Sequence, residues 1–207
     1  MRLIIFILLG NIIAYIAITT VIDTCLLGML GLYMPRRCDR KEFIVRDNNR
    51  IDIQKGFMCS AFSVAYILRH YGMEADGADI YGKMPHMMKD GCVYPKGLKK
   101  VLQQYGFSVR YCTGGLNALQ REICKAHPVI VMMRVRKDRK WLHYVPVVGF
   151  DERYIYIAES LPELVNCDGI NYNRRVRKNN FKQLWNTAML KQPLYKNTFF
   201  IIDSKEG

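Results

Sequence analysis

The sequence contains no Cys-x-x-Cys pair, no internal repeat and no low-complexity tract. Its seven cysteines are scattered instead. This argues against a zinc site of the usual spacing and against the dense disulfide framework of a small secreted protein. A reducing compartment explains free cysteines most simply, although their number leaves room for one or two disulfides.

Acidic residues are scarce, with 18 Asp and Glu against 31 Lys and Arg, which gives a formal net charge of +13. The excess favours an acidic partner such as nucleic acid, an anionic membrane surface or an acidic peptide, and a solvated basic face explains it equally well. The basic residues are not interleaved with aromatics and match no nucleic-acid motif, so nucleic acid is not an expected partner. Half of the residues are hydrophobic, which indicates a folded globular chain.

Polar residues are nearly absent from the first 34 positions. This apolar run is longer than the ~20 residues that a membrane-spanning helix needs. We interpret residues 1–34 as one uncleaved transmembrane anchor whose core span runs from Leu3 to about Val21. A cleaved signal peptide is the alternative, but no Ala-x-Ala site precedes a polar mature start.

A basic stretch at residues 35–49 follows the anchor and reads as a juxtamembrane linker, and residues 50–207 read as one domain. The linker carries more positive charge than the N-terminal flank of the anchor. The positive-inside rule then predicts a single-pass membrane protein with its domain in the cytoplasm. The residues behind this prediction are Arg2 on one side, and Arg36, Arg37, Arg40 and Lys41 on the other.

Helical patterns come first in the domain and strand patterns later, which is the α+β arrangement. The expected helices cover Cys59 to Tyr71, Leu98 to Tyr105, Leu116 to Ala126 and Phe181 to Met189. The expected strands cover residues 43–45, 107–112, 129–135, 141–150, 154–158 and 198–203. Residues 161–180 read as a polar, basic loop.

Cys59 lies where the first helix of the domain should begin, and Gly72 lies just past its end. The positive end of a helix dipole favours the thiolate, which is the nucleophilic form of cysteine. Five residues upstream, Gln54 is a neutral amide donor. Together with the Cys59 backbone N–H it could stabilise an oxyanion. The alternative is that Cys59 is simply a buried structural cysteine.

His143 is the one histidine of four that lies on a predicted strand beside a carboxylate-ended partner. If Phe150 pairs with Tyr154 across a three-residue turn, Glu159 becomes a diagonal neighbour of His143 on the same face. A register shifted by one residue would separate the two. A thiolate, an imidazole and a group that orients the imidazole form the apparatus of cysteine acyl transfer.

Several segments together resemble the double-glycine leader peptidases of bacteriocin export systems, a papain-like cysteine peptidase family. They are Gln54 with Cys59 at a helix start, the Tyr71-Gly72 helix end, Gly91-x-x-x-Pro-x-x-Leu98, Gly106-Phe107, Pro128-Val-Ile130 and the hairpin from His143 to Ile157. The resemblance covers about residues 50–203 and is strongest to the stand-alone branch of the family. It implies a papain-like fold, with N-terminal helices packed on a C-terminal antiparallel sheet.

The resemblance also implies roles: Cys59 as nucleophile, His143 as general base, Glu159 as the group that orients His143, and Gln54 as oxyanion donor. Two positions depart from the family pattern. The usual Asp-Cys-Gly is Met58-Cys59-Ser60 here, and the usual Asp-Pro is Glu159-Ser160. If Glu159 were not the orienting group, Asn166 or Asp168 would be the next candidates.

The predicted function is a membrane-anchored cysteine peptidase that needs no metal or cofactor. The resemblance implies cleavage of a leader peptide after small residues such as Gly-Gly, with any exporter on a separate chain, and the basic domain suits an acidic leader. An acyltransferase on the same scaffold and an inactive peptide-binding relative are the alternatives.

Overall fold

The computed structural model describes residues 2–22, 31–35, 38–85, 87–189 and 195–204. Parts of two predictions lie outside these residues. They are the end of the predicted anchor at 23–30 and two residues of the predicted basic flank, Arg36 and Arg37.

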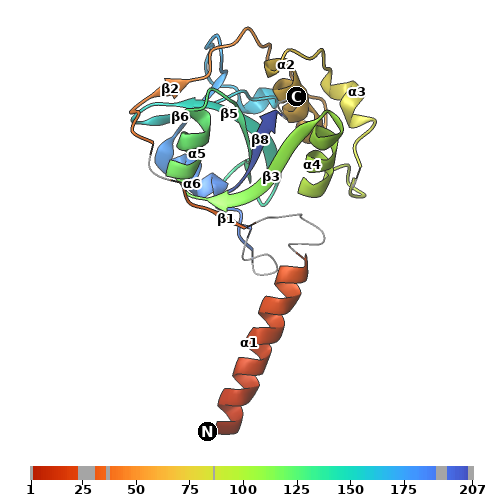
Figure 1. Ribbon diagram of the computed structural model, residues 1–207, viewed down its shortest axis with the longest axis vertical. Helices are drawn as coiled ribbons and strands as arrows, with labels where there is room; N and C mark the ends of the chain where they lie inside the picture. Colours follow the sequence, from red (N-terminus) through yellow and green to blue (C-terminus); the bar gives the residue numbers. More distant parts are fainter. Residues whose placement is uncertain (1, 23–30, 36–37, 86, 190–194, 205–207) are drawn as a thin grey trace.

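The first described element is the helix α1 (Arg2–Ile22), which stands apart from the remainder of the chain in Figure 1. An 18-residue window of this 21-residue helix has a mean hydropathy of 2.4, and almost all of its side chains are exposed. At 1.5 Å per residue the helix is about 31 Å long, close to the thickness of a bilayer hydrocarbon core. The helix is therefore long and apolar enough to cross a membrane. Many N-terminal signal sequences share these two properties.

The described residues form one sheet of eight strands. The strands are β1 (Leu32–Tyr33), β2 (Phe43–Ile44), β3 (Phe107–Gly114), β4 (Val129–Arg134), β5 (Leu142–Phe150), β6 (Tyr154–Ile157), β7 (Arg174–Arg177) and β8 (Thr198–Ser204). Their order is β1-β3-β8-β4-β5-β6-β7, and β2 pairs with the end of β5. All pairings are antiparallel except the short one between β1 and β3.

Helices cover both faces of this sheet (Figure 1). One face carries α2 (Cys59–His70) and α4 (Pro95–Gln104), with α3 (Gly77–Tyr81) packed on α2. The other face carries α5 (Leu116–Ile123) and α6 (Lys178–Trp185). A short 3-10 helix, η2 (Pro162–Leu164), follows β6. The result is an α+β domain, as the sequence predicted, with the sheet as the middle of three layers.

The alternation of apolar residues along the central strands explains the two cores. In β4, Ile130 and Met132 join the core beneath α2 and α4, whereas Val131 and Met133 join the core beneath α5 and α6. In β8, residues 200 and 202 join the core beneath α2 and α4. Residues 199 and 201 join the core beneath α5 and α6. Strands buried on both faces are almost wholly apolar, so their side chains hold two helical layers in place.

The main elements lie where the sequence predicts them, with differences at their ends. α4 starts at Pro95, three residues before the expected start, because proline suits the first turn of a helix. α5 ends at Ile123 instead of continuing to Ala126, and the C-terminal helix runs from Lys178 to Trp185 instead of from Phe181 to Met189.

The expected loop at residues 161–180 is wrong in part, because it contains β7 and the start of α6. Its charged residues hide the alternation of the strand. Arg174 and Val176 are buried, whereas Arg175 and Arg177 are exposed. Because arginine is polar, the sequence gives no sign that Arg174 faces inward. The alternation of buried and exposed residues can be recognised only once the buried partner of Arg174 is known.

The sheet also takes in residues from the segments predicted as anchor and linker. Tyr33 pairs with Gly114 in β3, and Phe43 pairs with Phe150 in β5. Val45, which follows β2, is buried and donates its N–H to the Val148 carbonyl at 2.8 Å. The domain boundaries at residues 34, 49 and 50 stay a prediction, but the chain contacts the domain from Leu32 onward.

Candidate active site

Cys59 is the first residue of α2 and is partly exposed. The preceding Met58 offers no side-chain cap, although its carbonyl accepts hydrogen bonds from the N–H groups of Ala61 and Phe62. The helix continues over eight buried residues and ends before Gly72, whose φ of +77° suits glycine. The N–H groups of Cys59 and Ser60 come before the first bonded N–H of the helix, and an anion is favoured at this end.

His143 lies near the start of β5, which packs directly against α2. Its Nε2 atom lies 2.7 Å from Oε1 of Glu159. Cys59 also interacts with the imidazole and favours its protonated form. Since Nε2 is taken by Glu159, the Nδ1 atom is the one left for the thiol. Cys59, His143 and Glu159 thus form one row of side chains with the imidazole in the middle.

The turn between β5 and β6 is one residue shorter than predicted, so the expected pairing of Phe150 with Tyr154 is wrong. Phe150 faces Ile155. The reason is the carboxylate of Asp151, which accepts hydrogen bonds from the N–H groups of Arg153 and Tyr154, both at 2.6 Å, and so closes a two-residue turn. With this register alone, His143 and Glu159 would lie on opposite faces of the hairpin.

A β-bulge restores the predicted proximity. The pairing shifts by one residue between Val147 and Gly149, so that Val147 faces Ile157. The Ala158 N–H then bonds to the Pro146 carbonyl at 3.0 Å and continues the corrected register. An extra residue in one strand moves every residue beyond it to the other face of its partner strand. The bulge at Val148 therefore places His143 on the same face as Glu159.

Glu159 is fully buried, and every oxygen of its carboxylate has a partner. Oε1 accepts from the backbone N–H of Leu161 at 2.8 Å and faces His143, and Oε2 accepts from Nη1 of Arg174 at 2.6 Å. The Asn173 side chain binds the backbone of Glu159 on both sides, accepting from its N–H and donating to its carbonyl. The longer glutamate side chain thus reaches His143 with little freedom to move.

Arg174 and Asn173 are not apparent as site residues from the sequence, because both lie in the segment read as a loop. Arg174 is only 5% exposed, and Glu159 neutralises it. The sequence offered no signal for them, because the inward position of Arg174 becomes apparent only once its buried acidic partner is known.

The charges of the buried groups support one another. Burial alone would lower the pKa of His143, but the charge of Glu159 and the hydrogen bonds with Cys59 and Glu159 prevail and raise it to about 10. Burial alone would raise the pKa of Glu159, but the imidazolium of His143 and the guanidinium of Arg174 lower it to about 2. Near neutral pH the pair is an imidazolium and a carboxylate, with a proton on Nε2.

Gln54 is buried and is tied to the residue that follows Glu159. Its Oε1 accepts from the hydroxyl of Ser160 at 2.6 Å, and its backbone N–H bonds to the Ser160 carbonyl at 2.8 Å. Its Nε2 donates one hydrogen to the Gly56 carbonyl at 2.6 Å. Serine in place of the family's proline thus supplies the hydroxyl that fixes the orientation of the Gln54 amide.

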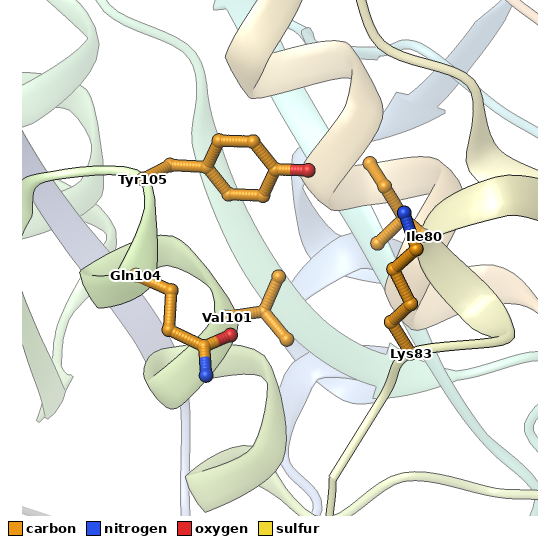
Figure 2. Close-up of a pocket in the computed structure, with 5 residues that line it drawn as sticks. All are labelled: Ile80, Lys83, Val101, Gln104 and Tyr105. Atoms are coloured by element: carbon orange, nitrogen blue, oxygen red, sulfur yellow. The ribbon is translucent and has the colours of Figure 1, made fainter.

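The other titratable candidates lie elsewhere. His70 is at the far end of α2 and contacts Asp47 and His127. Asn166 binds the backbone of Arg175 in β7, and Asp168 is exposed, so neither is the partner of His143. A small cavity between α3 and α4 holds none of the four candidates. Figure 2 shows its lining residues Ile80, Lys83, Val101, Gln104 and Tyr105.

No arrangement of three His, Cys, Asp or Glu side chains able to hold a metal ion occurs among the described residues. Besides the imidazole, the side chains on which a charge at Cys59 acts are those of Tyr81, Cys92 and Tyr144. The arrangement can therefore pass a proton between a thiol and an imidazole.

The arrangement of helices and sheet is that of solved peptidase domains. The peptidase domain of Streptococcus ComA, a bifunctional ABC transporter involved in quorum sensing, superposes with a TM-score of 0.57 at 16% identity over 77% of this chain and all of that domain. A protein from Bacillus anthracis described as a C39-like peptidase gives 0.58 at 15% identity over 81% of this chain and all of that one.

A third structure, a double-glycine motif protease from an AMS/PCAT transporter in complex with a leader peptide, gives 0.52 at 15% identity over 83% of this chain and all of that one. The fold is thus that of papain-like peptidase domains. At the level of sequence, the model of the Peptidase C39-like family matches residues 44–191, and the chain belongs to this family. No curated protein matches the sequence.

Proposed function

We propose that this chain is a membrane-anchored cysteine peptidase in which Cys59, His143, Glu159 and Gln54 carry the chemistry. The observation that supports it best is the row of Cys59, His143 and Glu159, in which the imidazole is hydrogen-bonded to Glu159 and interacts with Cys59. Membership of a peptidase family makes hydrolysis of a peptide bond the expected reaction.

In the proposed mechanism the proton of Cys59 resides on Nδ1 of His143, and the thiolate attacks the carbonyl carbon of the scissile bond. The oxyanion that forms is stabilised by the Cys59 backbone N–H and the second N–H of the Gln54 amide. The imidazolium then protonates the leaving amine, which departs and leaves a thioester on Cys59. His143 next deprotonates a water molecule, which attacks the thioester and releases the acid.

Glu159 has a different role, because it touches neither the thiol nor the substrate. Its carboxylate holds the Nε2 proton of His143, which fixes the tautomer and ring orientation and stabilises the imidazolium. Arg174 keeps Glu159 ionised and in place. The glutamate therefore performs the part that an aspartate has in the family pattern.

The proposed substrate is a leader peptide cut after small residues such as Gly-Gly. A protein of similar fold was crystallised as a double-glycine motif protease in complex with a leader peptide, which supports a peptide substrate. The formal charge of +13 favours an acidic leader. Under this proposal α1 is a membrane anchor, the domain faces the cytoplasm, and an exporter on a separate chain takes up the product.

The test is selective alkylation of the full chain in detergent micelles at pH 6. A free thiol is mostly protonated there, whereas a thiolate paired with an imidazolium reacts. A sub-stoichiometric pulse of iodoacetamide should label Cys59 ahead of Cys38, Cys92, Cys112, Cys124 and Cys167 when the peptides are mapped. His143→Ala should slow the labelling of Cys59 several-fold. Labelling spread over other cysteines, unchanged by His143→Ala, would contradict the proposal.

The activity itself is tested with acidic peptides that contain a Gly-Gly pair. The wild type should cut after the pair, and Cys59→Ala should bind the peptide and leave it intact. An added amine should not appear in the product, because transfer to an amine would indicate an acyltransferase. Binding without cleavage by the wild type would identify an inactive peptide-binding relative.

A further inference from the structure

A second pair of reactive groups lies on the opposite side of the sheet from α2. The Sγ atoms of Cys38 and Cys124 lie 2.7 Å apart, against about 2.05 Å for a covalent disulfide. Cys38 follows β1, and Cys124 is the residue at the C-terminal end of α5. The two cysteines are 86 positions apart in the sequence, so only the fold brings them together.

The two thiols meet because the chain before Cys38 is held against α5. Tyr33 pairs in the sheet beside β3, and its ring packs edge-on against Phe199 with the centroids 6.1 Å apart. Its hydroxyl donates to the buried carboxylate of Glu122 on α5 at 2.5 Å. Glu122 also binds Nζ of Lys125 at 2.8 Å. Cys38 then packs against the same core as α5.

The sulfur atoms open into a hollow with positively charged walls. The hollow has a volume of about 350 Å³ and is lined by Cys38, Asp39, Arg40, Arg121, Cys124 and Lys125. Three cations and one anion give the lining a formal charge of +2. Such a site attracts a small anionic molecule to the two sulfurs.

We propose that Cys38 and Cys124 are a modification site that forms a disulfide by exchange with an anionic low-molecular-weight disulfide of the oxidised-glutathione type. One protein thiolate attacks a sulfur of the small disulfide and expels one thiolate, which takes a proton. The second protein thiol loses its proton and attacks the mixed disulfide, which expels the second small thiol. The net change is two protein thiols and one small disulfide converted into one protein disulfide and two small thiols.

Either thiol can attack first in this scheme, because either sulfur can donate the hydrogen bond between them. Burial, together with the hydrogen bond and the charge of Cys38, raises the pKa of Cys124 to about 12, which favours Cys38 as the attacking residue. The other sulfur lies 2.7 Å away, within reach to resolve the mixed disulfide.

The disulfide would tie the segment that follows α1 to the domain and close a loop that contains α2, α3, α4, β3 and α5. Cross-linking a loop of this length restricts the unfolded chain strongly, so the Tm should rise by roughly 5–15 °C if the bond is unstrained. The pair lies on the other face of the sheet from α2, so the inference is independent of the proposed peptidase chemistry.

The experiment uses the full chain in detergent, incubated with oxidised glutathione, blocked with an alkylating agent and digested without reductant. A peptide linking Cys38 to Cys124 should appear, and the Tm should rise and return when dithiothreitol is added. Cys38→Ser and Cys124→Ser should each abolish the Tm change, whereas the matched control Cys167→Ser should keep it. The mapping uses the wild type, so it does not depend on whether a variant folds.

Charge selectivity provides the second readout. Oxidised glutathione should react several-fold faster than cystamine, a cationic disulfide, and added salt or Arg121→Gln should reduce the difference. Equal rates for the two reagents would contradict the anion site. The absence of a peptide linking Cys38 to Cys124 at equilibrium, or linkage of another cysteine pair, would overturn the proposal, whatever the outcome for Cys59.

Discussion

At the scale of single residues, Glu159 is where this chain departs from its family and where the structure explains the departure. A glutamate has one methylene more than the aspartate that the family pattern has at this position. The bulge at Val148 and the anchoring of the Glu159 backbone by Asn173 set the distance so that the longer side chain ends 2.7 Å from His143.

Glu159→Gln should keep the fold and lower kcat/KM for a validated peptide by roughly 10²–10⁴-fold, because the imidazolium loses its charge partner and its fixed tautomer. Glu159→Asp should retain more activity than Glu159→Gln because it keeps the charge. The measurement is the initial rate with each variant, with Tm as a check on folding. Equal rates for the wild type and Glu159→Gln would remove Glu159 from the proposed site.

Arg174 should stabilise the domain through Glu159. Arg174→Met leaves Oε2 of a buried carboxylate without its cation, which costs about 3–5 kcal/mol when one partner of a buried ion pair is removed. The matched control is Arg175→Met, because Arg175 is the next residue of β7 and is exposed. Urea denaturation should show a large loss for the first variant and less than about 1 kcal/mol for the second. Similar losses in both would contradict the role of Arg174.

The paired charges also predict how stability depends on pH. The pKa of His143 is about 10, above its ordinary value of 6.5, so its contribution is complete below pH 6.5 and is lost as pH rises through about 10. The pKa of Glu159 is about 2, below its ordinary value of 4.5, so its contribution is complete above pH 4.5 and is lost as pH falls through about 2.

Both contributions are therefore complete between about pH 4.5 and 6.5, and the difference in Tm between the wild type and a Glu159→Gln, His143→Ala double variant should be greatest there. Calorimetry between pH 3 and 10 measures it. A difference that stays constant across this range would show that the pair does not titrate as described.

At the scale of elements, the hairpin of β5 and β6 positions His143 near Glu159. The end of β5 also pairs with β2. Gly149 follows the bulge, and a Cβ atom there would lie 2.7 Å from the Phe43 carbonyl oxygen and 3.1 Å from the Cα atom of Ile44. Both contacts involve backbone of β2, which cannot yield as a flexible side chain would.

Gly149→Ala should therefore displace β2 from β5 and destabilise the domain by about 1–3 kcal/mol. Amide hydrogen exchange should show faster exchange at Val45, whose N–H bonds to Val148. Gly115→Ala is the matched control, because a Cβ atom at Gly115 meets nothing within 4 Å. Equal effects of the two substitutions would show that β2 does not need the close approach.

At the scale of the whole molecule, a long apolar helix and a basic peptidase domain belong to one chain. If α1 anchors the protein with the domain in the cytoplasm, protease added to intact cells should spare the domain, and protease added to permeabilised cells should digest it. Immunoblotting of the domain measures the result. A mature protein that begins after residue 30, or a domain digested from outside the cell, would contradict this topology.

The sequence by itself determined the helices, the apolar strands and the residues capable of the chemistry. These depend on local properties: the period of apolar residues, glycine at helix ends and a cysteine at a helix start. Such patterns predicted all four candidate residues, Gln54, Cys59, His143 and Glu159. They also predicted the helices and the antiparallel sheet.

Tertiary structure alone decided which of these residues meet. The side chain of Asp151 shortened the turn by one residue, and the bulge at Val148 compensated, so the proximity of His143 and Glu159 depends on two local irregularities that cancel. Arg174 looked like part of a solvated basic loop because a charge gives no sign of burial until its partner is known. Proximity across many residues of chain is a property of packing, which no local pattern encodes.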